Sequence, residues 1–180
     1  MSQVVIVSGP PGSGKSSVCE ALCARYDRTV HLETDQLYGA IRMGFIKPWL
    51  AASDRQNRMV TRAAARAAVA YAQELYAVFI DAVVGPHLLP VYVEELREAG
   101  VAVHFAVLLP SLEVTLRRGL EREPTLRVPE PQLRALWAQF RDNGAFAGCT
   151  IDNSAMTPDQ AADAVMSACG RGECLVLPAG

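Results

Sequence analysis

The chain has 180 residues, of which 51% are hydrophobic and 20% charged, and its formal net charge is −2. This length and composition predict one soluble globular domain, residues 1–180, with a substantial core. The slightly acidic balance disfavours nucleic acid and anionic membranes as partners, while a local basic patch stays compatible with it. The apolar runs are strand-sized or interrupted by charge, so the sequence predicts no membrane span and no cleaved leader.

Apolar runs alternate with helical patterns along the chain. Strands are expected at residues 4–7, 29–33, 77–80, 101–109 and 150–152, and 175–177 could form an edge strand. Helices are expected at residues 15–26, 54–75, 87–99, 111–122, 130–142 and 158–168, the last with Thr157 as its N-cap. This alternation predicts an α/β fold, a parallel sheet with helices on both faces. Active residues should then lie at the carboxyl ends of the strands.

Residues 9–16 read Gly-Pro-Pro-Gly-Ser-Gly-Lys-Ser and directly follow the first apolar run. This is the phosphate-binding loop (P-loop) pattern, in which glycines let consecutive N–H groups turn toward a phosphate. Lys15 is expected to reach the β- and γ-phosphates, and Ser16 to offer its hydroxyl to Mg²⁺. The predicted ATP-binding residues of the loop are Gly9, Pro10, Pro11, Gly12, Ser13, Gly14, Lys15, Ser16 and Ser17. The alternative, a plain glycine-rich turn, is disfavoured by the strand before it and the helix after it.

Two aspartates end predicted strands at the same edge as the loop. Phosphoryl transfer needs a carboxylate that orients or deprotonates the acceptor hydroxyl, and acidic oxygens near Mg²⁺. Asp35 is the candidate base, and Asp81, after a hydrophobic strand, is a candidate Mg²⁺ ligand, direct or through water. The alternative for each is that it caps the following helix.

Arginines are concentrated in residues 117–134, around a Pro-containing break between two helices. This region, about 118–132, is interpreted as a lid that brings Arg118, Arg122 and Arg127 to the triphosphate, with Arg118 and Arg122 supplying catalytic charge. The alternative is a solvated helical hairpin. A second arginine row, at 55, 58, 62 and 66, lies opposite the apolar stripe of Val60, Ala64, Ala67 and Tyr71, so most of it is expected at the surface.

The segment between Asp35 and the helix at 54 combines aromatic and basic residues beside the candidate base. We interpret residues 36–58 as the acceptor region, with Tyr38, Trp49 and Arg55 as candidate substrate contacts, joined by His87. Packing under a surface loop is an equally good explanation of this composition. His31 and His104 fall within strands and are expected to be core residues. The five scattered cysteines are expected to be free thiols in a reducing, cytoplasmic compartment.

With these features in place, residues 4–168 resemble small P-loop kinases related to chloramphenicol phosphotransferase, zeta toxin and gluconate kinase. The loop, the two aspartates, the arginine pair of residues 116–122 and Ile151-Asp152-Asn153-Ser154 carry the resemblance. It implies a sheet ordered 2-3-1-4-5, ATP with Mg²⁺, and transfer of the γ-phosphoryl group to a hydroxyl, with Asp35 serving the acceptor. It also implies that residues 151–154 and Arg118 approach the adenine, and that Arg122 or Arg127 approaches the phosphates.

The acceptor itself stays open, because antibiotics, sugars and nucleosides all fit this resemblance. A kinase acting on a polynucleotide end or a nucleotide-linked sugar is a second hypothesis, with the arginine row at 55–66 as its contact surface. A non-catalytic nucleotide switch is a third. A homodimer is compatible with the sequence, which contains no feature that specifies one.

Overall fold

The computed structural model describes residues 3–121, 127–142 and 144–179. Within them lies one sheet whose parallel strands follow the order β2-β3-β1-β4-β5, as the resemblance implied. These strands are β1 (Val4–Ser8), β2 (Thr29–Glu33), β3 (Ala77–Asp81), β4 (Val103–Leu108) and β5 (Thr150–Ile151). The C-terminal segment forms β6 (Leu175–Leu177), which pairs antiparallel with the start of β4. The sheet is therefore mixed, because an edge strand that directly follows a helix can return along β4 in the opposite direction.

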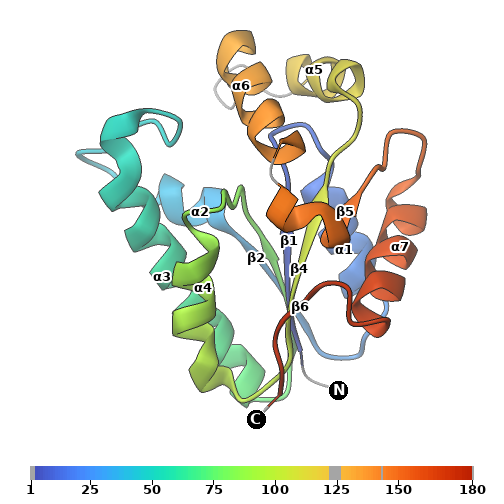
Figure 1. Ribbon diagram of the computed structural model, residues 1–180. Helices are drawn as coiled ribbons and strands as arrows, with labels where there is room; N and C mark the ends of the chain where they lie inside the picture. The colour runs from blue at the N-terminus through green and yellow to red at the C-terminus, as the bar shows by residue number, and fades with distance from the viewer. Residues whose placement is uncertain (1–2, 122–126, 143, 180) are drawn as a thin grey trace.

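Helices cover both faces of the sheet (Figure 1). The helices α3 (Asp54–Gln73) and α4 (Leu89–Leu96) pack together on one side, and α1 (Lys15–Cys23) and α7 (Pro158–Gly170) on the other. This burial on two faces explains why β1, β3 and β4 are predominantly apolar and are buried at every position. Among the described residues, no helix is long and apolar enough to cross a membrane.

The remaining helices lie toward the carboxyl ends of the strands, opposite the two chain termini in Figure 1. They are α2 (Thr34–Gly39), α5 (Leu112–Leu120) and α6 (Glu130–Arg141), and short 3₁₀ turns occur at Ala51–Ser53, Arg97–Ala99 and Gly144–Cys149. The sequence patterns missed α2, because a helix of six residues is too short to develop a periodic apolar face. The edge that holds α2 and the loop after β1 is the one on which the predicted active residues fall.

The buried face of α3 differs from the one predicted from the sequence. Its buried face runs through Asn57, Val60, Ala64, Ala68 and Ala72, so the helix is rotated slightly from the predicted stripe. Tyr71, predicted to face the core, is 43% exposed. Small alanines let the helix approach the sheet closely, and the larger ring is placed outside that contact.

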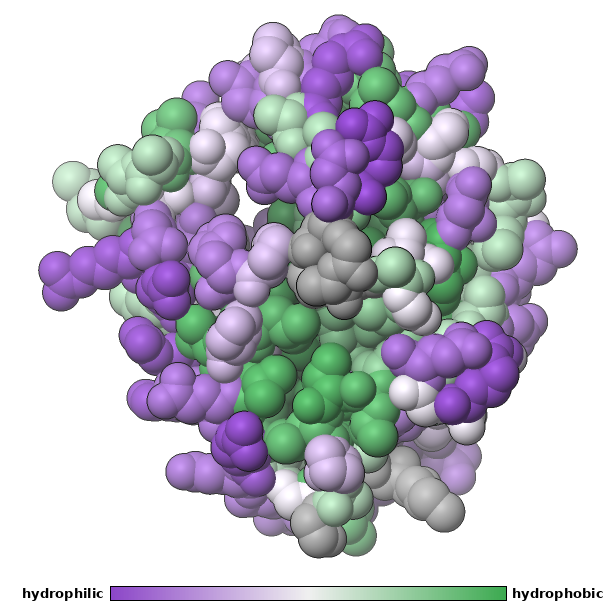
Figure 2. Space-filling model, in the orientation of Figure 1, coloured by the Kyte–Doolittle hydropathy of each residue, from purple (hydrophilic) through white to green (hydrophobic). Residues whose placement is uncertain are grey.

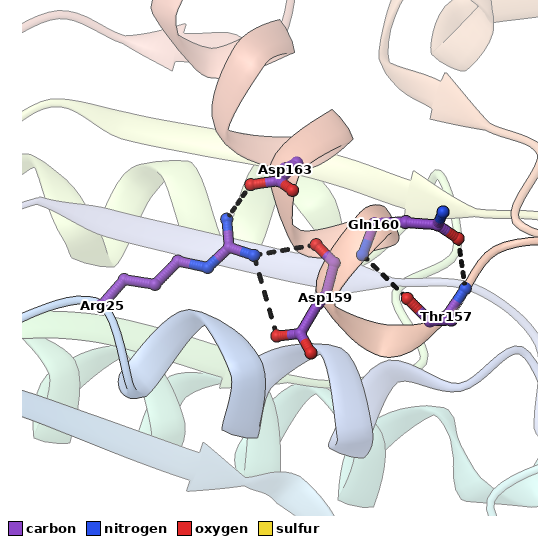
Figure 3. A network of polar contacts seen from close by, with 5 residues as sticks. All are labelled: Arg25, Thr157, Asp159, Gln160 and Asp163. Atoms are coloured by element: carbon purple, nitrogen blue, oxygen red, sulfur yellow. Dashed lines mark hydrogen bonds and ion pairs between the residues drawn. The ribbon is translucent and has the colours of Figure 1, made fainter.

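Polar contacts join the turn after α1 to the first turns of α7 (Figure 3). Arg25 donates to the Asp163 carboxylate at 2.5 Å and to the Asp159 carbonyl at 2.8 Å. Thr157 is the N-cap of α7, as expected, and forms a capping box with Gln160. These contacts fix the start of α7, and with it the segment 151–156 that precedes it.

Candidate active site at the carboxyl edge of the sheet

The loop between β1 and α1 has the geometry of an anion site. Gly9 has a φ of +139°, and a Cβ there would overlap the Leu108 carbonyl oxygen. Gly12 has a φ of +84°, and a Cβ there would lie 2.6 Å from the Thr115 carbonyl oxygen. Only glycine fits these positions, so the loop can turn its N–H groups inward. Gly14 is the N-cap of α1 and provides no side-chain cap, which leaves the first amides of the helix available to an anion.

Two side-chain contacts hold this loop in shape. The ammonium group of Lys15, which is buried, donates to the Pro10 carbonyl at 3.1 Å. The amide of Asn153 donates to the Ser13 carbonyl at 2.8 Å, so the segment after β5 is fastened to the loop. This contact places residues 151–154 beside the loop, where the resemblance puts the adenine. A hollow of about 440 Å³ lies at Asp152, Ser154, Ala155, Met156 and Gln160.

The carboxylate at the end of β3 faces the loop. The hydroxyl of Ser16 donates to Asp81 Oδ2 at 2.6 Å, and the imidazole Nε2 of His31 lies 3.8 Å from the same oxygen. Burial alone would raise the pKa of Asp81, but His31, the charge of Lys15 and the Ser16 hydroxyl together hold it below its ordinary value. Contact with Asp81 in turn raises the pKa of His31. Asp81 is therefore ionised at neutral pH, beside the hydroxyl that was expected to bind Mg²⁺.

Neither aspartate acts as a helix cap. Asp35 lies in the first turn of α2, whose N-cap is Glu33, and Asp81 is followed by an irregular segment before α4 begins at Leu89. The Thr34 hydroxyl donates to the Asp81 carbonyl at 3.0 Å, which fixes the start of α2 against β3. This bond sets Asp35 at the mouth of the site, where it is exposed.

One cavity of about 970 Å³ joins the phosphate-binding loop to the acceptor region. Lys15, Ser16, Asp35 and Asp81 line it together, and so do three of the four predicted substrate contacts, Tyr38, Trp49 and His87. Figure 2 shows an opening on this face, between the α3 side of the molecule and α6. The structure thus brings the loop, both aspartates and most of the acceptor region into a single space.

The predicted substrate contacts separate into two groups. Tyr38, Trp49 and His87 line the cavity, whereas Arg55 is exposed on α3 and is not among the lining residues. The Tyr38 hydroxyl donates to Asn57 Oδ1 at 2.9 Å, and burial, followed by the charge of Asp35, raises the pKa of Tyr38 to about 12. Tyr38 is therefore a neutral hydrogen-bonding group beside Asp35.

Of the arginines expected near the triphosphate, Arg118 lies beside the phosphate-binding loop. It lies on α5 and lines the cavity, and a Cβ on Gly14 would be 3.7 Å from its Nη1. Arg122 lies outside the described residues. Arg127 is exposed and is not among the lining residues. From α6, Leu136, Gln139 and Phe140 line the cavity. The two helices thus border the space, and closure of a lid stays a prediction.

Sequence reasoning missed two contributors. Asn57 is a buried amide on the apolar face of α3, and the signal that could have revealed it is a polar residue in register with Val60, Ala64 and Ala68. His31 was expected to be only a core residue, but it contacts Asp81. The sequence of β2 alone could not reveal the contact between His31 and Asp81. The contact depends on how β2 pairs with β3, where Glu33 lies opposite Asp81.

Comparison with solved structures identifies the fold. The tunicamycin resistance protein of Deinococcus radiodurans is 20% identical with a TM-score of 0.70, over 99% of this chain and 100% of that chain. A gluconokinase of Sinorhizobium meliloti is 20% identical with a TM-score of 0.67, over 95% of this chain and 93% of that chain. An APS kinase of Mycobacterium tuberculosis, in complex with AMPPNP and APS, is 19% identical with a TM-score of 0.64, over 94% of this chain and 98% of that chain.

At the level of sequence, no curated protein matches this chain. A family model described as "AAA domain" does match, over residues 4–143. The matched region starts with β1 and includes the phosphate-binding loop, both aspartates and Arg118. The chain therefore belongs to this AAA domain family and has the fold of the small P-loop kinases.

Proposed function

We propose that the protein is an ATP- and Mg²⁺-dependent phosphotransferase that moves the γ-phosphoryl group of ATP to a hydroxyl of a small molecule. The observation that carries this proposal is the shared cavity, in which the Asp35 carboxylate faces the same space as Lys15 and Ser16. A triphosphate held by the loop would present its terminal group toward that space, where an acceptor alcohol can reach Asp35.

The residues divide the chemistry among them. Lys15 and Arg118 supply positive charge around the transferred group. The acceptor oxygen forms a bond to the γ-phosphorus, and the bond from that phosphorus to the bridging oxygen breaks. ADP leaves with the electron pair of the broken bond, and the hydroxyl proton passes to the Asp35 carboxylate.

The site also suits Mg²⁺. The Ser16 hydroxyl and the ionised Asp81 are oxygen donors, which Mg²⁺ prefers, and it usually binds one or two protein oxygens together with phosphates and waters. When bound, the ion neutralises charge on the β- and γ-phosphates. The Ser16–Asp81 contact at 2.6 Å holds the two donors together.

The decisive experiment is Asp35→Asn, assayed with ATP, Mg²⁺ and a panel of hydroxylated molecules, with phosphorylated product detected by mass. The variant should lose a factor of about 10² to 10⁴ in kcat while ATP still binds, because only the proton acceptor is removed. Asp27→Asn, an exposed aspartate in the turn after α1, is the matched control and should keep full activity. Unchanged turnover in Asp35→Asn would refute the assignment of the base.

The surface of α3 argues against a polynucleotide-end kinase. Arg58 pairs with Asp54 at 2.9 Å, and Arg62 and Arg66 pair with Glu95 of α4 at 3.5 and 2.8 Å. These carboxylates reduce the attraction of the row for a phosphate backbone. A nucleotide switch predicts ATP binding without any phosphorylated product, which the same assay distinguishes.

A further inference from the structure

The acceptor half of the cavity has predominantly apolar walls. The segment between α2 and α3 contributes Ile41, Phe45, Trp49 and Leu50, and the opposite walls consist largely of apolar side chains from the β3–α4 connection, α4 and α6. These opposing residues are Val83, Val84, Leu88, Tyr92, Leu136 and Phe140. Phe45, Leu50 and Val83 are exposed, at 48%, 47% and 37%, although they border the cavity. Large apolar side chains facing an open space provide a surface that an apolar ligand can cover.

The polar side chains that α2 and the start of α3 contribute to this half are bonded to neighbouring groups of the protein. The Asn57 amide donates to the Pro48 carbonyl at 2.9 Å and to Ser53 Oγ at 3.0 Å. The Ser53 hydroxyl shares its one hydrogen between the carbonyls of Pro48 and Leu50, which lie 2.8 and 2.6 Å from its Oγ. The hydroxyl of Tyr38 is bonded to Asn57, and Asp54 is paired with Arg58. A ligand rich in hydroxyls would find these partners engaged and would lose hydrogen bonds to water without replacement.

Positive charge is also unevenly distributed. Among the described residues that line the cavity, the lysines and arginines are Lys15, Lys47 and Arg118. Lys15 and Arg118 lie at the phosphate-binding loop. The Lys47 ammonium lies 5.6 Å from the centre of the Trp49 ring, so its charge is directed at an aromatic face. The acceptor half therefore lacks, in the described part of the chain, the arginine fork that typically binds a carboxylate or phosphate.

From these three observations we propose that the acceptor is an uncharged alcohol with a bulky aromatic or aliphatic body. This proposal rests on the proposed function and specifies its substrate class. The body lies against Trp49, Phe45 and the α6 side chains, and its hydroxyl points to Asp35. Sugar acids and nucleotides are poor acceptors, because their charged groups would be removed from water without a partner.

Matched acceptors test the class directly. Phenylethanediol and its naphthyl analogue are neutral aryl diols, mandelate replaces one hydroxymethyl group by a carboxylate, and gluconate is a charged polyol. We expect kcat/KM for the aryl diols to exceed the values for mandelate and gluconate by about tenfold or more, a typical scale for discrimination by a pocket. Binding of each compound to the protein loaded with a non-hydrolysable ATP analogue is measured by calorimetry. The aryl diols should bind with a negative heat-capacity change.

Two variants test whether the apolar walls of the cavity cause the preference for aryl diols. Trp49→Ala should raise KM for the aryl diols about tenfold or more and leave KM for ATP unchanged, since the proposal places the ring against the acceptor body and not against the nucleotide. Tyr71→Ala, an exposed aromatic residue on α3 outside the cavity, is the control and should change neither constant.

The outcomes separate the two proposals. If mandelate or gluconate is the better acceptor and Lys47→Met abolishes that advantage, the kinase stands and the neutral class is wrong. If the aryl diols do not bind the loaded protein in calorimetry, the class is likewise wrong, whatever else is phosphorylated. If they bind but no panel member is phosphorylated, the proposed function fails while the binding preference of the pocket is retained.

Discussion

Replacing Asn57 with alanine should loosen the acceptor side of the cavity and leave the phosphate-binding side intact. Asn57 is 8% exposed and makes three hydrogen bonds, to Pro48, Ser53 and Tyr38. The Pro48 carbonyl keeps its bond from Ser53, so the groups that lose a partner are the Tyr38 hydroxyl and Ser53 Oγ. At about 1 kcal/mol for each lost bond, plus a small cavity, the free energy of unfolding should fall by roughly 2–3 kcal/mol.

Urea unfolding monitored by circular dichroism measures this loss. With a slope of about 2 kcal/mol/M for a domain of this size, the midpoint should decrease by about 1–1.5 M. Gln73→Ala is the matched control, because Gln73 lies on the same helix and its amide donates to the Glu98 carbonyl from an exposed position. Its effect should stay within about 0.5 kcal/mol.

A double-mutant cycle isolates the contact with the acceptor region. Tyr38→Phe combined with Asn57→Ala should give a coupling free energy of about 1 kcal/mol, because both single changes break the same 2.9 Å bond. KM for the acceptor should rise in Asn57→Ala while ATP affinity is retained. A midpoint equal to that of the unmodified protein, or a coupling of zero, would refute the role given to this network.

Three further changes test other parts of the structure. Gly12→Ala should weaken ATP binding about tenfold or more in calorimetry, since its Cβ would lie 2.6 Å from the Thr115 carbonyl at a φ of +84°, whereas Gly170→Ala, with open space around it, should bind normally. His31→Gln tests the ion pair with Asp81 in metal-free buffer. Contact with Asp81 raises the His31 pKa above its ordinary 6.5, so the pair stabilises the fold fully below about pH 6.5, and the advantage over the variant should shrink as the pH rises through the raised pKa. A constant difference would exclude the pair. Thr157→Ala should cost about 1 kcal/mol through loss of the cap, and Arg25→Ala less, because the partners of Arg25 are solvent-exposed; equal melting temperatures would contradict the first expectation.

The sequence was most informative where chemistry depends on local spacing. The loop after β1, the position of Asp35 two residues after β2 and that of Asp81 at the end of β3 are local facts. The alternating apolar and helical patterns were sufficient to predict a parallel sheet covered by helices, whereas the strand order came from the resemblance. Each of these features requires a residue type at a fixed distance from a strand end, which can be read without knowledge of the packing.

The parts that escaped prediction depend on how elements pack. The rotation of α3 that buries Asn57 and exposes Tyr71 follows from the close approach of its alanines to the sheet. The sequence pattern did not distinguish a buried face that includes Tyr71 from one that includes the next residue, Ala72. The contact between His31 and Asp81 depends on strand pairing. Arg55 was expected to reach the acceptor because it lies near the start of its helix, but it is exposed and is not among the residues that line the cavity.

The segment 40–53 is attached to the fold mainly by side chains of the helix that follows it. Gln56 exchanges two hydrogen bonds with the backbone of Ile46, at 2.8 and 2.6 Å, and Asn57 holds Pro48. No residue of this segment belongs to a strand of the sheet. We therefore expect this segment to be exchangeable: a graft that keeps Gln56 and Asn57 should change which acceptor binds and leave the phosphate-binding loop unaltered.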